Sequence, residues 1–168
     1  LASPLATPVT TTFSYDTGNR VSNITNALSR STQFVYNTSG NLTTIINALG
    51  DTSSFTYDTF GRRETFRDFN GNLTKFDYID GCGCGSPGRV DYADGTYQVF
   101  TKNHFGQITS EKWYEANNTL AEQRLTDYDS QGRVTKETDG TGNTVRKFYN
   151  GHLLDWEIIV SPESLDGD

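Results

Sequence analysis

The chain has 168 residues, a formal net charge of −7, and only 33% hydrophobic residues. Nucleic-acid binding depends on Lys and Arg that neutralise phosphates, so an acidic chain without a basic cluster argues against a nucleic-acid partner. No stretch approaches the roughly 20 consecutive apolar residues of a membrane span, which argues against membrane insertion.

Residues 1–12 form a leader of β-prone and proline residues that carries no charge. Two interpretations stay open: an extended strand donated to another chain, or a disordered linker. The sequence contains no Met, so we expect a chain that is processed or cut from something longer.

From residue 13 onward a tyrosine recurs at a fixed stride. The intervals are 21 residues within each of two series, which are Tyr15, Tyr36, Tyr57 and Tyr78, and then Tyr128 and Tyr149. A fixed period of this size predicts an array of repeats. Each unit carries two turn signals, one of the form Tyr-Asp-x-x-Gly-Arg, as in residues 57–62, and one Asn- or Asp-containing cluster with Gly, as in residues 47–51.

The stretches between the turn signals are short and rich in Thr, Val, Ile, Phe and Tyr, as strands require. Each unit is therefore predicted to be one β-hairpin, and successive strands are expected to pair antiparallel. The predicted fold is all-β: tandem β-hairpin repeats of 21 residues that form a continuous antiparallel ribbon over residues 13–160, followed by a tail at residues 161–168. Whether the ribbon is curled or spiralled stays open.

A phenylalanine stands two residues before each of the first four tyrosines, and residues two apart in a strand point to the same face. The predicted structural ladder consists of Phe13, Tyr15, Phe34, Tyr36, Phe55, Tyr57, Phe76, Tyr78, Tyr128 and Tyr149. We interpret it as a buried packing ladder in preference to a platform that stacks ligands, since periodic aromatic residues in strands usually pack on each other.

The stride fails in two places. An irregular insert at residues 79–88 lengthens one turn by six residues, and a longer loop at residues 113–120 precedes Tyr128. Between them, residues 102–108 keep a Gly and an apolar residue but lack the Tyr and Arg of the motif. Irregular loops are where a repeat array often carries specific function.

The insert contains Cys82 and Cys84, the only cysteines in the chain. Three interpretations stay open: two small residues in a glycine-rich turn, a disulfide that is local and strained or made to another chain, or a metal site. A zinc site needs four ligands, and His104 and His152 do not stand at ligand spacing, so we predict neither a metal nor a cofactor.

The motif in residues 57–62 and 128–134, repeated in tandem with the 21-residue period, resembles the YD-repeat or RHS-repeat family over about residues 13–150. The resemblance implies a ribbon that spirals into a shell, as in toxin-complex proteins, or that lies on a bacterial cell surface. It also implies a secreted or surface location and no catalysis by the repeats. The shells of that family need far longer chains, and no Asp-Pro dipeptide of the family's self-cleavage region occurs here.

Several further residues are candidates for modification or contact. Possible N-glycosylation sequons, which in a chain so rich in Asn and Thr also arise by chance, start at Asn23, Asn37, Asn41, Asn72 and Asn117. Interface candidates are Trp113 and Tyr114, beside the longer loop, and Trp156, in an apolar segment at residues 152–160 that is predicted to end the array.

No nucleophile, phosphate-loop or zinc-protease motif occurs, so the sequence predicts a protein without enzymatic activity. The favoured hypothesis is a structural module of an extracellular or cell-surface fibre, joined to copies of itself through sheet edges. The first alternative is a segment of a larger encapsulating shell, whose partners are the adjacent repeats of a longer chain. The second is a surface adhesin that binds glycans through Trp113 and Tyr114.

Overall fold

The computed structural model describes residues 9–78 and 85–161, and every regular element in these ranges is a β-strand, which confirms the all-β prediction. The strands are β1 (Thr12–Tyr15), β2 (Val21–Thr25), β3 (Ser31–Tyr36), β4 (Leu42–Ile46), β5 (Thr52–Tyr57), β6 (Arg63–Arg67), β7 (Leu73–Asp77), β8 (Arg89–Asp91), β9 (Tyr97–Lys102), β10 (Ile108–Tyr114), β11 (Leu120–Tyr128), β12 (Val134–Thr138), β13 (Thr144–Asn150) and β14 (Leu153–Val160).

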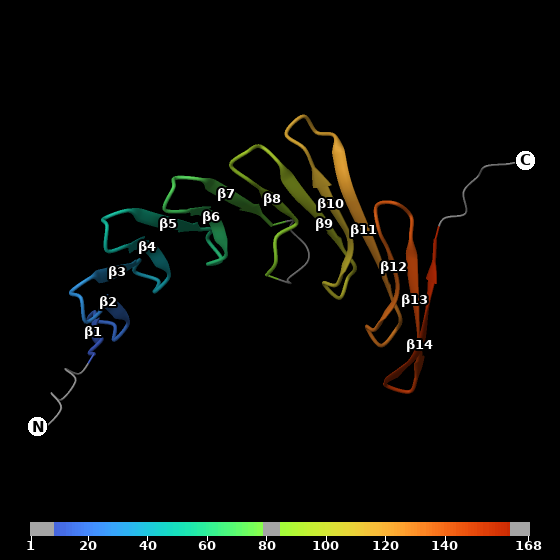
Figure 1. The fold of residues 1–168 in the computed structure, drawn as a ribbon, viewed down its shortest axis with the longest axis horizontal. Helices are drawn as coiled ribbons and strands as arrows, with labels where there is room; N and C mark the ends of the chain where they lie inside the picture. The colour runs from blue at the N-terminus through green and yellow to red at the C-terminus, as the bar shows by residue number, and fades with distance from the viewer. Residues whose placement is uncertain (1–8, 79–84, 162–168) are drawn as a thin grey trace, which may run out of the picture. The chain divides into compact units, whose positions relative to one another are not determined.

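The order of the strands in the sheet is the order of the chain, from β1 to β14, and the registers that define the pairing are antiparallel (Figure 1). The predicted hairpin ribbon is therefore confirmed. The chain divides into two compact units, unit 1 at Leu1–Thr74 and unit 2 at Lys75–Asp168, and each is described by itself below.

Eleven turns in the described residues share one five-residue form. In the turn at residues 37–41, the Asn37 amide donates to the Asn41 carbonyl at 2.9 Å and the Gly40 amide donates to the Asn37 carbonyl at 3.0 Å. This is a type I turn followed by a residue in the left-handed region, the common three-residue hairpin connection. Gly40 has φ +89°, as the form requires, whereas Asn19 takes this place in the first repeat with φ +59°.

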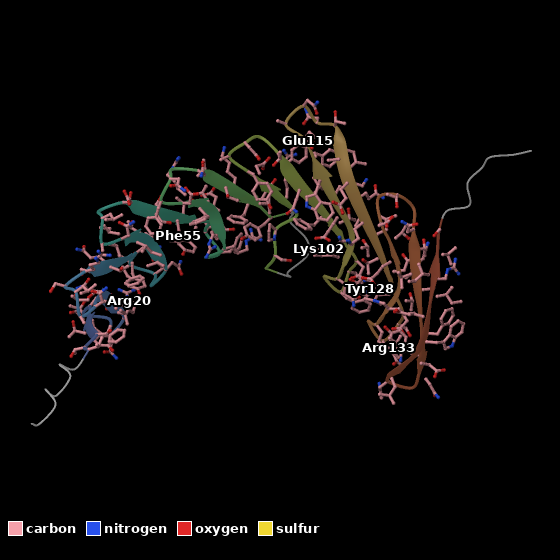
Figure 2. All side chains as sticks on the ribbon, in the orientation of Figure 1. Arg20, Phe55, Lys102, Glu115, Tyr128 and Arg133 are labelled. Atoms are coloured by element: carbon pink, nitrogen blue, oxygen red, sulfur yellow. The ribbon has the colours of Figure 1, made fainter. Side chains whose placement is uncertain are left out.

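Successive turns alternate between the two ends of the strands, so each unit has two rims. The first-turn rim holds the turns that follow the recurrent tyrosine, at residues 16–20, 37–41, 58–62 and 129–133, and the equivalent turn at residues 103–107, which follows Lys102. The second-turn rim holds the turns at residues 26–30, 47–51, 68–72, 92–96, 115–119 and 139–143. In unit 2, Figure 2 shows Glu115 at one end of the strands and Tyr128 and Arg133 at the other.

A β-bulge recurs beside the motif tyrosine. In the β3–β4 hairpin Val35 lies opposite Thr44 and Tyr36 lies opposite Leu42, so Thr43 is an extra residue in β4. The Thr43 hydroxyl donates to the Val35 carbonyl at 3.2 Å, which satisfies an acceptor that the bulge displaces. Register shifts stand at the same place beside Tyr15, Tyr57, Tyr128 and Tyr149.

The predicted ladder lies on one face of unit 1, where phenylalanines meet apolar partners across the strands: Phe13 faces Ile24, Phe34 faces Ile45 and Phe55 faces Phe66. The Phe55 and Phe66 rings stack with their centroids 5.2 Å apart. The structure differs from the expected burial, because the ladder stays half-exposed and Tyr15 is 58% exposed. Among the described residues only the side chains of Val90 and Ser53 are buried, since a single-layer sheet has no second layer to cover either face.

The ladder changes character in unit 2. Phe76 still faces Val90, but Thr126 and Lys147 occupy the places two residues before Tyr128 and Tyr149. The Lys147 ammonium forms an ion pair with Glu137 on the same face. In the last repeats a polar and a charged side chain therefore replace the phenylalanines of the ladder, a change that the tyrosine stride does not reveal.

The longer loop expected at residues 113–120 is a hairpin end instead. β10 extends to Tyr114, β11 begins at Leu120, and residues 115–119 form the common five-residue turn. The additional residues lengthen the two strands, because Thr, Trp, Tyr and Leu around the turn favour strand pairing. Of the insert, residues 79–84 lie outside the described residues, and Cys82 and Cys84 lie there with them. The described residues contain no helix long and apolar enough to cross a membrane.

Candidate functional site

The motif aspartate holds its own turn together. One carboxylate oxygen of Asp58 accepts hydrogen bonds from the backbone amides of Phe60 and Arg62, both at 2.9 Å. The other oxygen accepts from the Arg62 guanidinium at 2.6 Å. Asp16 and Asp129 repeat these contacts in their own turns. The Tyr-Asp-x-x-Gly-Arg spacing thus lets one aspartate both stabilise the turn backbone and form an ion pair with the arginine.

The motif arginine contacts the tyrosine of the next repeat. The Arg20 guanidinium lies 4.6 Å from the centre of the Tyr36 ring, and Arg133 lies 4.4 Å from the centre of the Tyr149 ring. A guanidinium over an aromatic face is attracted by the ring quadrupole. Because Asp16 and Asp129 fix the two guanidinium groups from the other side, each arginine joins its own turn to the following hairpin.

The motif tyrosine contacts the repeat before it. The Tyr36 hydroxyl donates to the Val21 carbonyl at 2.9 Å, and the Tyr57 hydroxyl donates to the Leu42 carbonyl at 2.7 Å. In unit 2 the same bonds join Tyr128 to Ile108 at 2.9 Å and Tyr149 to Val134 at 2.8 Å. These carbonyls belong to the residue that starts each bulged strand. The recurrent tyrosine therefore forms a hydrogen bond between neighbouring repeats, which explains why it recurs once per repeat.

The first-turn rim carries a second row of contacts. In unit 2 the side chain before two of the bulged strands reaches the glycine of the next turn along the rim: the Gln107 amide donates to the Gly132 carbonyl at 2.9 Å, and Arg133 donates to the Gly151 carbonyl. A Cβ added at Gly132 would lie 3.1 Å from the Gln107 side chain. Glycine at this place serves both the positive φ of the turn and the approach of the preceding repeat.

The aspartates of these turns have lowered pKa values. The Arg20 guanidinium is the main cause for Asp16, and the backbone amide of Arg133 is the main cause for Asp129. For Asp58, desolvation would raise the pKa, but the backbone amide and guanidinium of Arg62 outweigh it. In the second-turn rim, hydrogen bonds from Thr141 and Asn143 lower the pKa of Asp139 to about 2. These carboxylates are held ionised as acceptors within turns.

The degenerate turn at residues 103–107 keeps this backbone form without the Tyr and Arg. Asn103 accepts from the amides of Phe105 and Gln107, as the aspartates do elsewhere. Lys102 stands where the tyrosine would be, and its ammonium donates to the carbonyls of Ser86 at 2.7 Å and Pro87 at 2.9 Å. Burial lowers the pKa of Lys102. Lys102 thereby ties the end of the irregular insert to the sheet.

The three interface candidates lie in two different settings. The Trp113 ring has the Arg124 guanidinium 5.7 Å from its centre, and Tyr114 stacks on Tyr97 with centroids 4.7 Å apart. One face of each ring is thus occupied by the protein itself, which leaves less room for a stacked sugar. Trp156, on β14, is exposed and stacks on Phe148 with centroids 3.9 Å apart.

The five sequons occupy unequal positions. Asn23 bonds to Thr25 and Ser31 within the sheet, Asn37 and Asn41 belong to one turn, and Asn72 donates to Asp68. Asn117 stands at an exposed turn, where its side-chain oxygen accepts from the Thr119 amide. No group of three or more His, Cys, Asp or Glu in the described ranges is arranged to hold a metal ion.

Sequence reasoning missed the contacts between repeats, although their signal was present. The arginine and the apolar residue that follows it recur with the tyrosine, which indicated that the three act together. The recurrent bulge and the Tyr97–Tyr114 stack had no comparable signal, because the first depends on strand register and the second on residues from an irregular hairpin.

Comparison with known proteins finds a family that matches the first repeats of the chain. The RHS Repeat family matches residues 15–52 and 36–73. No curated protein sequence matches the chain.

Solved structures share the fold. A crystal structure of TcdB2-TccC3 without its hypervariable C-terminal region has a TM-score of 0.74 and 16% identity over 90% of this chain, and one of TcdB2-TccC3-Cdc42 has a TM-score of 0.67 and 11% identity over 84%. A Tc holotoxin pore from Photorhabdus luminescens has a TM-score of 0.52 and 12% identity over 79%. This chain spans 9% of the length of each of these three.

Proposed function

We propose that this chain, whose residues 15–73 are RHS repeats, is a segment of the wall of a larger, shell-forming protein of the RHS type. The family match is the observation that carries the proposal. In this function the repeats do no catalysis. Their partners are the adjacent repeats of a longer chain, and the whole protein is secreted or displayed on a cell surface.

The contacts between repeats support a wall. Neighbouring hairpins are joined by strand pairing, four of the motif tyrosines donate to the preceding repeat, and two of these tyrosines also carry an arginine on their ring. Each repeat contacts only the repeats beside it and is stabilised by them. The number of repeats can therefore increase without a new kind of contact. The solved structures with this fold are also much longer than this chain, as a closed wall requires.

The test is to express the protein encoded by the complete gene and to image it by electron microscopy. We expect a closed hollow particle whose wall contains the hairpins of residues 12–160. Filaments, or an open array that ends within a few repeats, would contradict the proposal.

A fibre joined through sheet edges is the second candidate, and β14 favours it. This strand has eight residues, all of them exposed, and within the described residues it pairs with β13 alone. Its outer edge therefore presents backbone groups to which another strand can bond. Filaments of the 168-residue chain in electron micrographs would support the fibre, and their disappearance on substituting Ile158→Lys and Val160→Lys would place the contact at this edge.

A further inference from the structure

Asparagine stands directly before glycine at two places in the chain, at residues 70–71 and 150–151. Asparagine is one of the chemically labile residues of proteins. Its side chain reacts most easily when glycine follows, because a residue without a Cβ leaves its backbone nitrogen open to approach. Both asparagines are exposed to solvent. Sequence and exposure therefore do not separate the two sites.

The two sites also share most of their surroundings. Gly71 has φ +87° and Gly151 has φ +60°, and a Cβ placed at either meets no atom of the described chain within 4 Å. An arginine donates to the carbonyl of each glycine, Arg67 to Gly71 and Arg133 to Gly151. A guanidinium in this place favours negative charge on the backbone nearby. Its effect is matched at the two sites.

The sites differ at the backbone amide of the glycine. The Gly71 amide donates to the Asp68 carbonyl at 3.1 Å, as the five-residue turn requires. Asn150 ends β13 and pairs with Leu153, so the last hairpin has a loop of two residues that begins with Gly151. The positive φ of Gly151 fits a type II′ turn, in which the amide at the first loop position takes no part in closing the turn. Within the part of the chain that the structure describes, the Gly151 amide donates to no group.

We propose that Asn150 is a site of spontaneous deamidation and that the turn around Asn70 protects the other asparagine. The Gly151 nitrogen gives up its proton to water and attacks the side-chain carbonyl carbon of Asn150. The new carbon–nitrogen bond closes a five-membered succinimide, and the bond to the side-chain nitrogen breaks as ammonia leaves. Water then opens the ring at either carbonyl and yields an aspartate or a β-aspartyl residue.

The hydrogen bond at Gly71 slows the same reaction. The Gly71 proton can leave only after the bond to the Asp68 carbonyl has opened, and the nitrogen must turn out of the closed turn to reach the side chain. One backbone hydrogen bond of ordinary strength reduces the rate by about tenfold, equal to about 1.4 kcal/mol. The free amide of Gly151 needs no such opening.

The products change the last hairpin. A β-aspartyl residue adds one carbon to the backbone at position 150, where Asn150 pairs with Leu153, so the strands beyond it lose their register. Within the described residues β14 pairs with β13 alone, so no second strand holds it in place. Deamidation should therefore loosen β14 first. The inference is independent of the wall function, because it is carried by the amide of one turn.

The experiment incubates the 168-residue chain at neutral pH, folded in buffer and, in parallel, unfolded in guanidinium chloride. Peptide mapping by mass spectrometry follows the conversion of Asn70 and Asn150 with time, and enzymatic methylation detects β-aspartyl residues. The matched variant is Asn150→Gln, which keeps an amide but must close a larger ring. Hydrogen exchange of β14 compares the aged parent chain with the aged variant.

We expect Asn150 to react about tenfold faster than Asn70 in the folded chain, and the two to react at similar rates in the unfolded chain. Hydrogen exchange in β14 should rise with time in the parent chain and stay constant in the variant. A rate ratio that is no larger in the folded chain than in the unfolded chain overturns the proposal. So does a folded chain in which Asn150 stays intact while the unfolded chain reacts. Equal loosening of β14 in the variant contradicts its assignment to Asn150. Imaging of the complete protein tests the wall separately.

Discussion

The two rims of unit 1 have the same turn backbone and opposite surroundings. On the first-turn rim, Arg20 reaches from its own turn to the neighbourhood of Gly40 and to the Tyr36 ring, so this turn is fastened to the next hairpin. On the second-turn rim, Gly50 and Gly71 have open space and Leu49 points to solvent. The first-turn rim therefore carries the contact between repeats at Arg20, while both rims also present exposed apolar tips, Phe60 on the first and Leu49 on the second.

The largest expected difference comes from truncating one side chain on each rim. Tyr36→Ala removes the bond to the Val21 carbonyl, the contact with Arg20 and the packing of a half-buried ring, and we expect it to lower the free energy of unfolding by about 3 kcal/mol. Leu49→Ala removes an exposed side chain and should change it by less than about 0.5 kcal/mol. Urea unfolding followed by circular dichroism measures both.

Equal losses in the two variants would contradict this division between the rims. Because the repeats form a linear array, an interrupted contact should also loosen its neighbours. Hydrogen exchange in the Tyr36→Ala variant should accordingly rise in β2 and β3 more than in β5, and a uniform rise would indicate global unfolding instead.

The two rims share the positive φ of the glycine in each turn, and the same substitution on each rim tests this shared feature. Gly40 and Gly50 both have φ +89°, and an alanine in that conformation should lower the free energy of unfolding by about 1–2 kcal/mol on either rim. Arg20 stands 3.4 Å from the added Cβ at Gly40, which is ordinary contact, so we expect Gly40→Ala and Gly50→Ala to differ by less than about 0.5 kcal/mol. Thermal unfolding of the two variants side by side checks this. A much larger loss at Gly40 would mean that the rims differ in the geometry of the turn as well.

The sequence predicted the hairpins well because their signals are local. Asx residues and Gly place each turn, and the stride of Tyr57 and its equivalents gives the repeat length. The partner of the Tyr57 hydroxyl, the Leu42 carbonyl, depends on the register between strands, and a bulge shifts that register by one residue. The ladder was expected to be buried because alternation shows which side chains share a face. It does not show whether a second layer covers that face.

Removing only the hydroxyl group should affect stability at a tyrosine inside the array but not at the first tyrosine. Tyr57→Phe leaves the Leu42 carbonyl without its donor and should lower the free energy of unfolding by about 1 kcal/mol. Tyr15 begins the described array, and its hydroxyl donates to no other described residue, so Tyr15→Phe should have no measurable effect. Urea midpoints of the two variants test this contrast. If the Tyr57 variant matched the parent chain, the bond to the preceding repeat would not be what the stride preserves.

The smallest expected effect is the pH dependence of stability, which should differ between turns that carry Asp and turns that carry Asn. Asp16, Asp58 and Asp129 have pKa values below 3.8 when folded, so their contribution to stability is complete above that pH and is lost as the pH falls through the folded pKa. For Asp139 that loss extends down to about pH 2. We therefore expect the chain to lose stability steadily as the pH is lowered below about 4.

The variant Asp58→Asn assigns part of this acid sensitivity to one turn. Asn37 shows that an amide oxygen supports the same turn, since it accepts from the Asn41 amide at 2.9 Å, but an amide does not titrate and attracts Arg62 less. The variant should be slightly less stable than the parent chain at pH 7, and the difference should shrink as the pH falls through the lowered pKa of Asp58 and the parent's carboxyl becomes protonated. Urea unfolding of both proteins from pH 7 to pH 2 measures the difference. A gap that stays constant throughout acid titration, down to the pH at which the parent itself unfolds, would contradict a contribution of the Asp58 charge to the stability of this turn.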